Sequence, residues 1–336
     1  MKTASASIDT EAASARYRAA AIDLAGRRIL VTNFRDSEQE QDLAQPPNCN
    51  GFGRIRHFQR RTSTGWPANP LPIEPACRAL RLPPTDQLPA QVFQNAVCNW
   101  RCWYCFVPFN LLSANHAHSD WLSADELIEL YLAQDHPPPV IDLTGGQPDI
   151  TPEWVPWMMK GLIARGLEKA VYLWSDDNLS TDYFWRYLSG AERSLVASYP
   201  SYGRVCCFKG FDAASFAFNT KAEPSLFDRQ FDLMGRLLKS GIDLYAYATL
   251  TAPSGAGVSK AMRLFVDRLQ QLHHNLPLRT VPLKIGLYAP VLPRLDVDAR
   301  FALSVQDDAV AVWCEELERR YSAAERSMHA TDIPLT

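Results

Sequence analysis

From residue 91 onward, short apolar runs alternate with longer amphipathic stretches, and this alternation limits the possible folds more than any other feature. The short runs are rich in β-branched and aromatic residues and predict strands, and the stretches between them predict helices. Because parallel strands need long crossovers, the pattern indicates βα units and a parallel sheet. The predicted strands are residues 92–97, 140–144, 170–175, 204–209, 244–250 and 283–288.

Helices are predicted between and after these strands. Ser123 and Glu126 have the spacing of a capping box, so a helix should begin there and run to about residue 134. Other amphipathic stretches predict helices at 153–164, 181–188, 227–239, 259–273 and 305–323. Ahead of this core, residues 27–34 are expected to form a strand and residues 1–25 a loose tail.

Three cysteines lie in one short segment directly after the first of these strands. Cys98, Cys102 and Cys105 have the spacing C-x3-C-x2-C, with Tyr104 just before the last cysteine. Three thiolates on one loop can bind three irons of a [4Fe–4S] cluster, which leaves the fourth iron open to a substrate or cosubstrate. Zinc is the alternative, but structural zinc sites usually close with four ligands in two pairs. No second pair is present, so the segment favours an iron–sulfur site.

This cysteine loop resembles that of the radical S-adenosylmethionine (radical SAM) enzymes. The resemblance implies an α/β fold, a partial (β/α)6 TIM-like barrel with an N-terminal extension. Residues 91–290 would form the core and residues 1–90 the extension, which is expected to cap the substrate site. Residues 291–336 would form a C-terminal helical segment.

The same resemblance implies a [4Fe–4S] cluster and SAM as cofactors. An electron donor such as flavodoxin or ferredoxin would reduce the cluster, and SAM would split into methionine and a 5′-deoxyadenosyl radical. That radical would then abstract a hydrogen atom from the substrate. The protein would place the substrate and exclude water, since the cofactor supplies the difficult step.

A Gly-Gly-Gln-Pro sequence at the end of the second core strand resembles the Gly-Gly-Glu-Pro motif of this family. By that resemblance Gly145, Gly146 and Gln147 would bind the amino end of SAM. Glycine lets the backbone approach a ligand closely. The departure from the motif is Gln147, whose neutral amide can still accept a hydrogen bond from the SAM ammonium.

Polar residues also follow the third and fourth core strands. Ser175 and Asp177 are candidates for a contact to the SAM ribose or carboxylate, and Lys209 for a contact to a carboxylate or substrate anion. Strand alternation places Lys209 on the same face as Cys207. Because an unpaired buried lysine is costly, Lys209 is expected to have an acidic neighbour if it points into the barrel.

The expected substrate is a peptide or protein, and the alternative is a nucleotide or another anionic small molecule. The segment Lys-Gly-Phe-Asp at 209–212 resembles activating-enzyme-like radical SAM proteins and favours a peptide or protein. The arginines of residues 54–61 instead suit a nucleotide or another anionic small molecule, because guanidinium groups bind phosphates and carboxylates with two parallel bonds. A protein needs a wide barrel mouth, whereas a small molecule needs a mouth closed by the N-terminal region. A non-catalytic iron–sulfur or zinc protein is the alternative from another class.

Five further cysteines stand outside the triplet. Cys49 lies in a polar, glycine-containing loop and is a candidate hydrogen-atom donor or substrate contact, against the simpler interpretation of a loop thiol. The others are Cys77, Cys206, Cys207 and Cys314, for which the sequence favours core positions over a chemical role.

Composition excludes several other kinds of protein. A net charge of −3 over 336 residues gives no electrostatic reason to expect nucleic-acid binding. No apolar run approaches the roughly 18 residues of a membrane span. The N-terminus lacks the basic and apolar regions of a signal peptide, so a cytoplasmic protein with reduced or metal-bound cysteines is expected.

Overall fold

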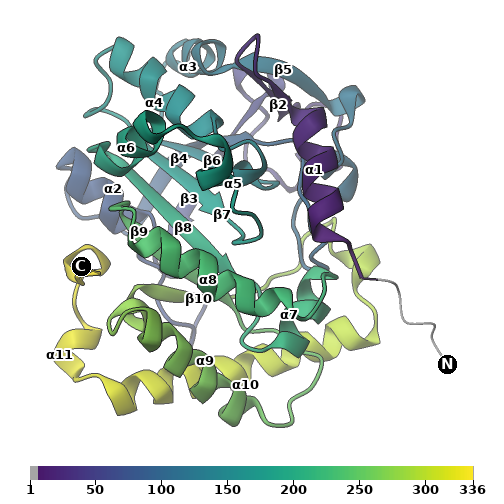
Figure 1. Ribbon diagram of the computed structural model, residues 1–336, viewed down its shortest axis with the longest axis vertical. Coiled ribbons are helices and arrows are strands. Elements are labelled where there is room, and N and C mark those ends of the chain that lie inside the picture. Colours follow the sequence, from purple (N-terminus) through teal and green to yellow (C-terminus); the bar gives the residue numbers. More distant parts are fainter. Residues whose placement is uncertain (1–6, 336) are drawn as a thin grey trace.

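A seven-stranded sheet curled into a half-barrel forms the centre of the molecule, and helices surround its outer side (Figure 1). The computed structural model describes residues 7–335. The strand order is β10-β9-β8-β7-β6-β4-β3, in which β3 is antiparallel to β4 and every other neighbouring pair is parallel. The strands are β3 Gly53–Gln59, β4 Gln87–Gln94, β6 Val140–Thr144, β7 Tyr172–Asp177, β8 Tyr202–Phe208, β9 Leu244–Thr249 and β10 Thr280–Leu283.

Helices connect the parallel strands and cover the convex face of the sheet (Figure 1). Ser123 and Glu126 do form the predicted capping box at the start of α3. The long α10 begins eight residues earlier than the sequence predicted and packs along α9. The helices of the core are α3 Ala124–Leu132, α4 Trp154–Ala164, α5 Tyr183–Tyr187, α6 Gly190–Ser198, α7 Ala213–Thr220, α8 Leu226–Leu238, α9 Val258–Leu272, α10 Val297–Arg320 and α11 Ala323–Arg326.

Alternation along each strand divides the buried side chains between two cores. On β7, Leu173 points to the convex face and joins the large core beneath the helices, whereas Trp174 points to the concave face. The concave core is smaller and is filled partly by helix α2 Ile73–Leu80. Because α2 covers the amino-terminal half of this face, the concave face stays open for a ligand only toward the carboxyl ends of the strands.

The N-terminal region contains a short helix and packs onto the core. Within the predicted tail, residues 7–25 contain helix α1 Thr10–Ala21, whose Arg18 is 8% exposed and pairs with the buried Glu153. The predicted strand 27–34 is confirmed as β2 Arg28–Thr32. It belongs to a small separate sheet with β1 Ile22–Asp23 and β5 Ser119–Ser123.

Two predicted features differ in position. The last core strand was expected at residues 283–288, but β10 is Thr280–Leu283 and residues 284–288 form no strand. The predicted boundary between residues 90 and 91 falls inside β4, and β3 extends the main sheet. Residues 53–59 are therefore part of the sheet itself. Within the described residues, no helix is both long and apolar enough to cross a membrane.

Candidate functional site at the carboxyl ends of the strands

The loop with Cys98, Cys102 and Cys105 lies at the carboxyl end of β4, where ligands bind in parallel sheets. Arg101 holds the loop in shape, because its guanidinium donates hydrogen bonds to the backbone oxygens of Cys98 (2.6 Å) and Trp100 (2.9 Å). Backbone bonds also tie the loop to the end of α7, from Trp103 N to Asn219 O (3.2 Å).

Helix α1 also supports the cysteine loop, through hydrogen bonds to Asn99 and Trp100. The Asn99 amide donates to the Ser14 hydroxyl on α1 at 2.9 Å, and the Trp100 indole donates to the Thr10 hydroxyl at 3.0 Å. Asn99 is 1% exposed and also donates to Ser180 (2.8 Å). The position of the cysteines thus depends on a helix that precedes them by some eighty residues.

The three thiols are free, half-buried and close enough for their charges to interact. Burial raises the pKa of Cys102 to about 12, while the positive charge of Lys209 acts in the opposite direction. Among residues 7–335, no three His, Cys, Asp or Glu side chains are arranged to hold a metal ion as they stand. The donor set itself fits a [4Fe–4S] cluster, since three soft thiol ligands on one loop leave one iron without a protein ligand.

The glycine loop after β6 lies directly against the start of the cysteine loop. Gly145 and Gly146 have φ angles of 68° and 65°, a region that favours glycine. A Cβ on Gly146 would lie 2.3 Å from the backbone oxygen of Val97, so no larger residue fits. The Gln147 N–H donates to that same oxygen at 2.8 Å. The glycines therefore allow the loops after β4 and β6 to meet.

The side chain of Gln147 points away from this edge and is fully engaged inside the protein. Its amide nitrogen donates to Asp177 Oδ1 at 3.0 Å, and its amide oxygen accepts from the Asn178 N–H at 3.0 Å. Gln147 is 1% exposed. Only the backbone of this residue is available for the SAM contact that the sequence suggested.

Ser175 and Asp177, both candidates from the sequence, are not brought to the concave face. The Ser175 hydroxyl lies 2.7 Å from the Tyr202 hydroxyl, and Asp177 lies 3.6 Å from the Arg204 guanidinium, all of them buried. β7 ends at Asp177 rather than at the predicted Ser175, and both residues share the convex face with Leu173. Alternation instead places Asp176 on the concave side.

Two charged residues lie on the concave face near the ends of β7 and β8. They are Asp176, on β7, and Lys209, which directly follows β8. Burial raises the pKa of Asp176, and its carboxylate pairs with the Thr144 hydroxyl on β6. Burial opposes the charge on Lys209, but the charges of Cys207, Tyr104, Cys102 and Asp176 together raise its pKa well above the usual value. Among the described residues, Lys209 forms no ion pair with an acidic side chain, and Asp176 acts on it only through its charge. Asp176 could have been found from the sequence only by placing the end of β7 correctly.

The other candidate cysteines lie elsewhere. Cys49 is packed under α3, where its thiol lies 3.5 Å from the Leu130 oxygen, and burial raises its pKa to about 12. Cys206 joins the convex core and Cys207 the concave core, as alternation predicted. Cys77 and Cys314 lie on α2 and α10. The structure therefore does not bring Cys49 to the cysteine triplet.

A cavity of about 430 Å³ lies at this end of the concave face, between β3, the N-terminal segment and the residue that follows Cys105. Arg54 and Arg56 line it from β3, and Phe106 and Tyr288 line it from the other side. The arginines of residues 54–61 were expected to form either a pocket or a solvated strand, and the structure places these two in a cavity.

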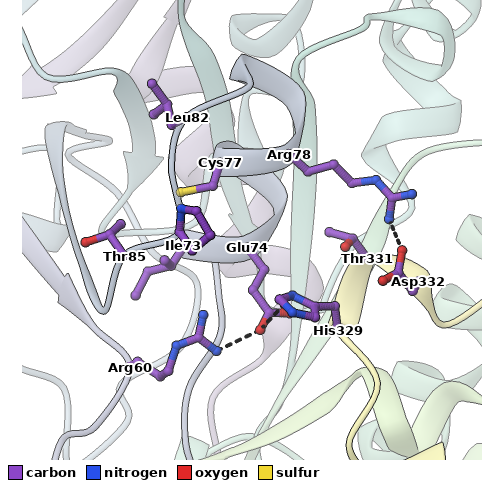
Figure 2. A pocket seen from close by; sticks show the side chains of 11 residues that line it. Arg60, Ile73, Glu74, Cys77, Arg78, Leu82, Thr85, His329, Thr331 and Asp332 are labelled. Atoms are coloured by element: carbon purple, nitrogen blue, oxygen red, sulfur yellow. Dashed lines mark hydrogen bonds and ion pairs between the residues drawn. The ribbon is translucent and has the colours of Figure 1, made fainter.

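A second cavity, of about 310 Å³, lies at the opposite end, between α2 and the C-terminal segment (Figure 2). Its charged side chains are paired with one another. Glu74 lies 2.7 Å from Arg60 and 3.4 Å from His329, and Arg78 pairs with Asp332. With its charges satisfied internally, this cavity offers no free group for a charged ligand.

No protein-family model matches the chain, and no curated protein matches it. Among solved structures, part of the chain is similar to SuiB of Streptococcus suis, in its complexes with precursor peptide SuiA and with S-adenosylmethionine. Each match has 17% sequence identity and a TM-score of 0.38. The matches cover 54% and 53% of this chain, and the chain spans only 36% of the length of SuiB.

Proposed function

We propose that this protein is a radical SAM enzyme. The observation that carries the proposal is the meeting of the two loops, one with three free thiols and one with two glycines, at the carboxyl edge of neighbouring parallel strands. Bound at the three thiols, a [4Fe–4S] cluster would supply the electron that splits SAM into methionine and the hydrogen-abstracting 5′-deoxyadenosyl radical.

The residues of the chain hold and orient the reactants in this proposal. Cys98, Cys102 and Cys105 bind the cluster. The backbone at Gly145 and Gly146, packed against the start of the cysteine loop, binds the amino end of SAM. Lys209 places a positive charge on the concave face, where a carboxylate of SAM or of the substrate can pair with it.

The substrate is proposed to be a small anionic molecule rather than a peptide or protein. Gly210 and Asp212, which made the sequence resemble activating enzymes, have structural roles: a Cβ on Gly210 would lie 2.5 Å from Phe216 N, and Asp212 caps α7.

The N-terminal region also crosses the open side of the half-barrel. The Trp66 indole donates to Pro282 O on β10 at 2.9 Å, and Asp42 accepts from the Ala289 N–H at 3.2 Å. Such closure favours a small molecule.

Anaerobic reconstitution with iron and sulfide tests the enzyme proposal. The protein should bind about four irons and four sulfides per chain and, with dithionite as reductant, form 5′-deoxyadenosine from SAM. Flavodoxin or ferredoxin should replace dithionite as the electron donor. Cys102→Ala should lose both the cluster and the SAM cleavage, because only two thiolates remain on the loop.

Cys49→Ala is the matched control, since it removes a thiol packed under α3 and should keep the full iron content. Iron incorporation by the unaltered protein without any 5′-deoxyadenosine would rule out the enzyme proposal in favour of a non-catalytic iron–sulfur protein. Binding of zinc alone, with no iron–sulfur absorbance, would contradict the cluster assignment.

A further inference from the structure

Arg54 is a buried charge without a partner. Its side chain points to the concave face from β3, opposite Val92 of β4, and the residue is only 6% exposed. Its guanidinium makes no hydrogen bond or ion pair with any residue of the described part of the chain, and its Nε and Nη2 atoms are fully buried. The Phe34 and Phe106 rings lie beside it, with centroids 5.9 and 5.4 Å from the guanidinium carbon.

An unpaired buried guanidinium is costly, so a folded protein normally gives it an acidic partner. The acidic groups of the concave face make their contacts with other residues, although Oδ1 of Asp142 is buried without a hydrogen-bond partner. Asp142 pairs with Arg56 at 3.4 Å, and Asp176 pairs with Thr144. Burial and the charge of Arg56 lower the pKa of Arg54 to about 10, although the charges of Asp142 and Asp176 act in the opposite direction. Three cationic groups, Arg54, Arg56 and Lys209, thus face two buried carboxylates.

The cavity beside Arg54 has the size and position of a ligand site. Its volume of about 430 Å³ lies in the range of small-molecule sites and is too small for a folded partner. Phe106, which contacts Arg54, directly follows Cys105 of the cysteine loop, and the Tyr288 ring lies 6.1 Å from the Phe106 ring. Leu43 of the N-terminal segment lines the same space. A molecule held by Arg54 would therefore lie next to the proposed radical chemistry.

We propose that Arg54 and Arg56 bind a carboxylate or phosphate group of the small-molecule substrate within this cavity. That this ligand is a substrate rests on the proposed function. The chemistry of the site is that of two planar guanidinium groups, which bind planar or tetrahedral oxyanions with paired, charge-assisted hydrogen bonds. Arg54 lines the inner wall of the cavity, and Arg56 adds charge at the more exposed side.

Calorimetric titration of the reconstituted full-length protein with inorganic phosphate and, separately, with succinate tests the site and distinguishes the two anions. At least one of them should bind at low ionic strength. Arg54→Met should weaken that binding about 10- to 100-fold, since charge-assisted hydrogen bonds are lost. Arg61→Met is the matched control: it removes the same charge from an exposed residue just beyond β3, outside the cavity, and should bind as the unaltered protein does.

Leu43→Trp is a second variant that fills the cavity mouth without touching the buried arginine, and it should also weaken binding. The proposal is overturned if the unaltered protein binds neither anion, or if a folded Arg54→Met or Leu43→Trp variant binds as tightly as the unaltered protein. Complete displacement of the anion by SAM would also overturn it, because the site would then belong to the cosubstrate. Anion binding needs no SAM cleavage, so failure of this proposal and failure of the enzyme proposal are distinguishable.

Discussion

At the scale of single residues, Gln147 has a structural explanation. Its amide nitrogen donates to Asp177 at 3.0 Å in a buried environment. A glutamate at this position, as in the motif that the loop resembles, would put a second carboxylate against Asp177. Two buried like charges destabilise each other, and one of them would have to bind a proton. A neutral amide avoids this conflict and leaves the backbone of the loop unchanged.

Gln147→Glu is therefore expected to lower the free energy of unfolding by about 1–3 kcal/mol at pH 7, because a buried hydrogen bond is replaced by repulsion. Adding Asp177→Asn should recover much of the loss, since the new asparagine can donate to the glutamate. Urea denaturation of both variants measures the difference. Equal stability of Gln147→Glu and the unaltered protein would show that the two side chains do not interact as described.

At the scale of elements, strand alternation decides which polar residues face the concave side. β7 directs Trp174 and Asp176 inward, and Asp177 outward to Arg204 of β8. Asp149, from the short 3-10 helix Pro148–Ile150, also pairs with Arg204, at 3.1 Å. Two carboxylates thus share one buried guanidinium where the loops after β6 and β7 meet the strand β8.

Burial, reinforced by the charge of Asp177 and opposed by Arg204, raises the pKa of Asp149 to about 8. In the unfolded chain an aspartate has a pKa of about 3.9, so between these values the folded protein binds more protons. Stability should therefore fall as the pH rises from about 4 to 8, by up to about 1.4 kcal/mol per pH unit from this group.

Asp149→Asn should remove this contribution to the fall of the free energy of unfolding with pH. Urea denaturation at several pH values measures that fall. Asp125→Asn is the control, because Asp125 lies in an exposed ion pair with Arg165 on the protein surface. If the free energy of unfolding of Asp149→Asn depends on pH as that of the unaltered protein does, Asp149 is ionised throughout the range from about pH 4 to 8.

At the scale of the whole molecule, the N-terminal region is built into the core. α1 supports the cysteine loop through Ser14, β3 extends the sheet, and Trp66 bonds to β10 across the open side. The C-terminal segment returns to α2, where Ala330 N–H donates to Glu74 at 2.6 Å. These contacts tie both terminal regions to the half-barrel.

A chain that begins at residue 91 should therefore fail to fold cooperatively, because it lacks half of β4, all of β3 and the α1 contacts. A chain that begins at residue 7 is the control and should melt like the full-length protein. Thermal unfolding followed by circular dichroism measures both. A sharp transition of the shorter chain would establish residues 91–336 as an independent domain.

Features that depend on neighbouring residues can be predicted before the fold is known. The capping box at Ser123 and the strand 140–144, which matches β6, are local features, and both were placed correctly. Their physical basis is backbone geometry and the alternation of buried side chains, both of which act over a few residues.

The packing of the whole chain determines which polar groups share a face and which residues enclose them. The predicted strand ended at Ser175, so Asp176 fell outside it and strand alternation was not applied to that residue. The cavity beside Arg54 joins residues that are far apart in the sequence, as does the bond from Trp66 to Pro282. Such contacts depend on how the chain packs as a whole, so no local pattern in the sequence encodes them.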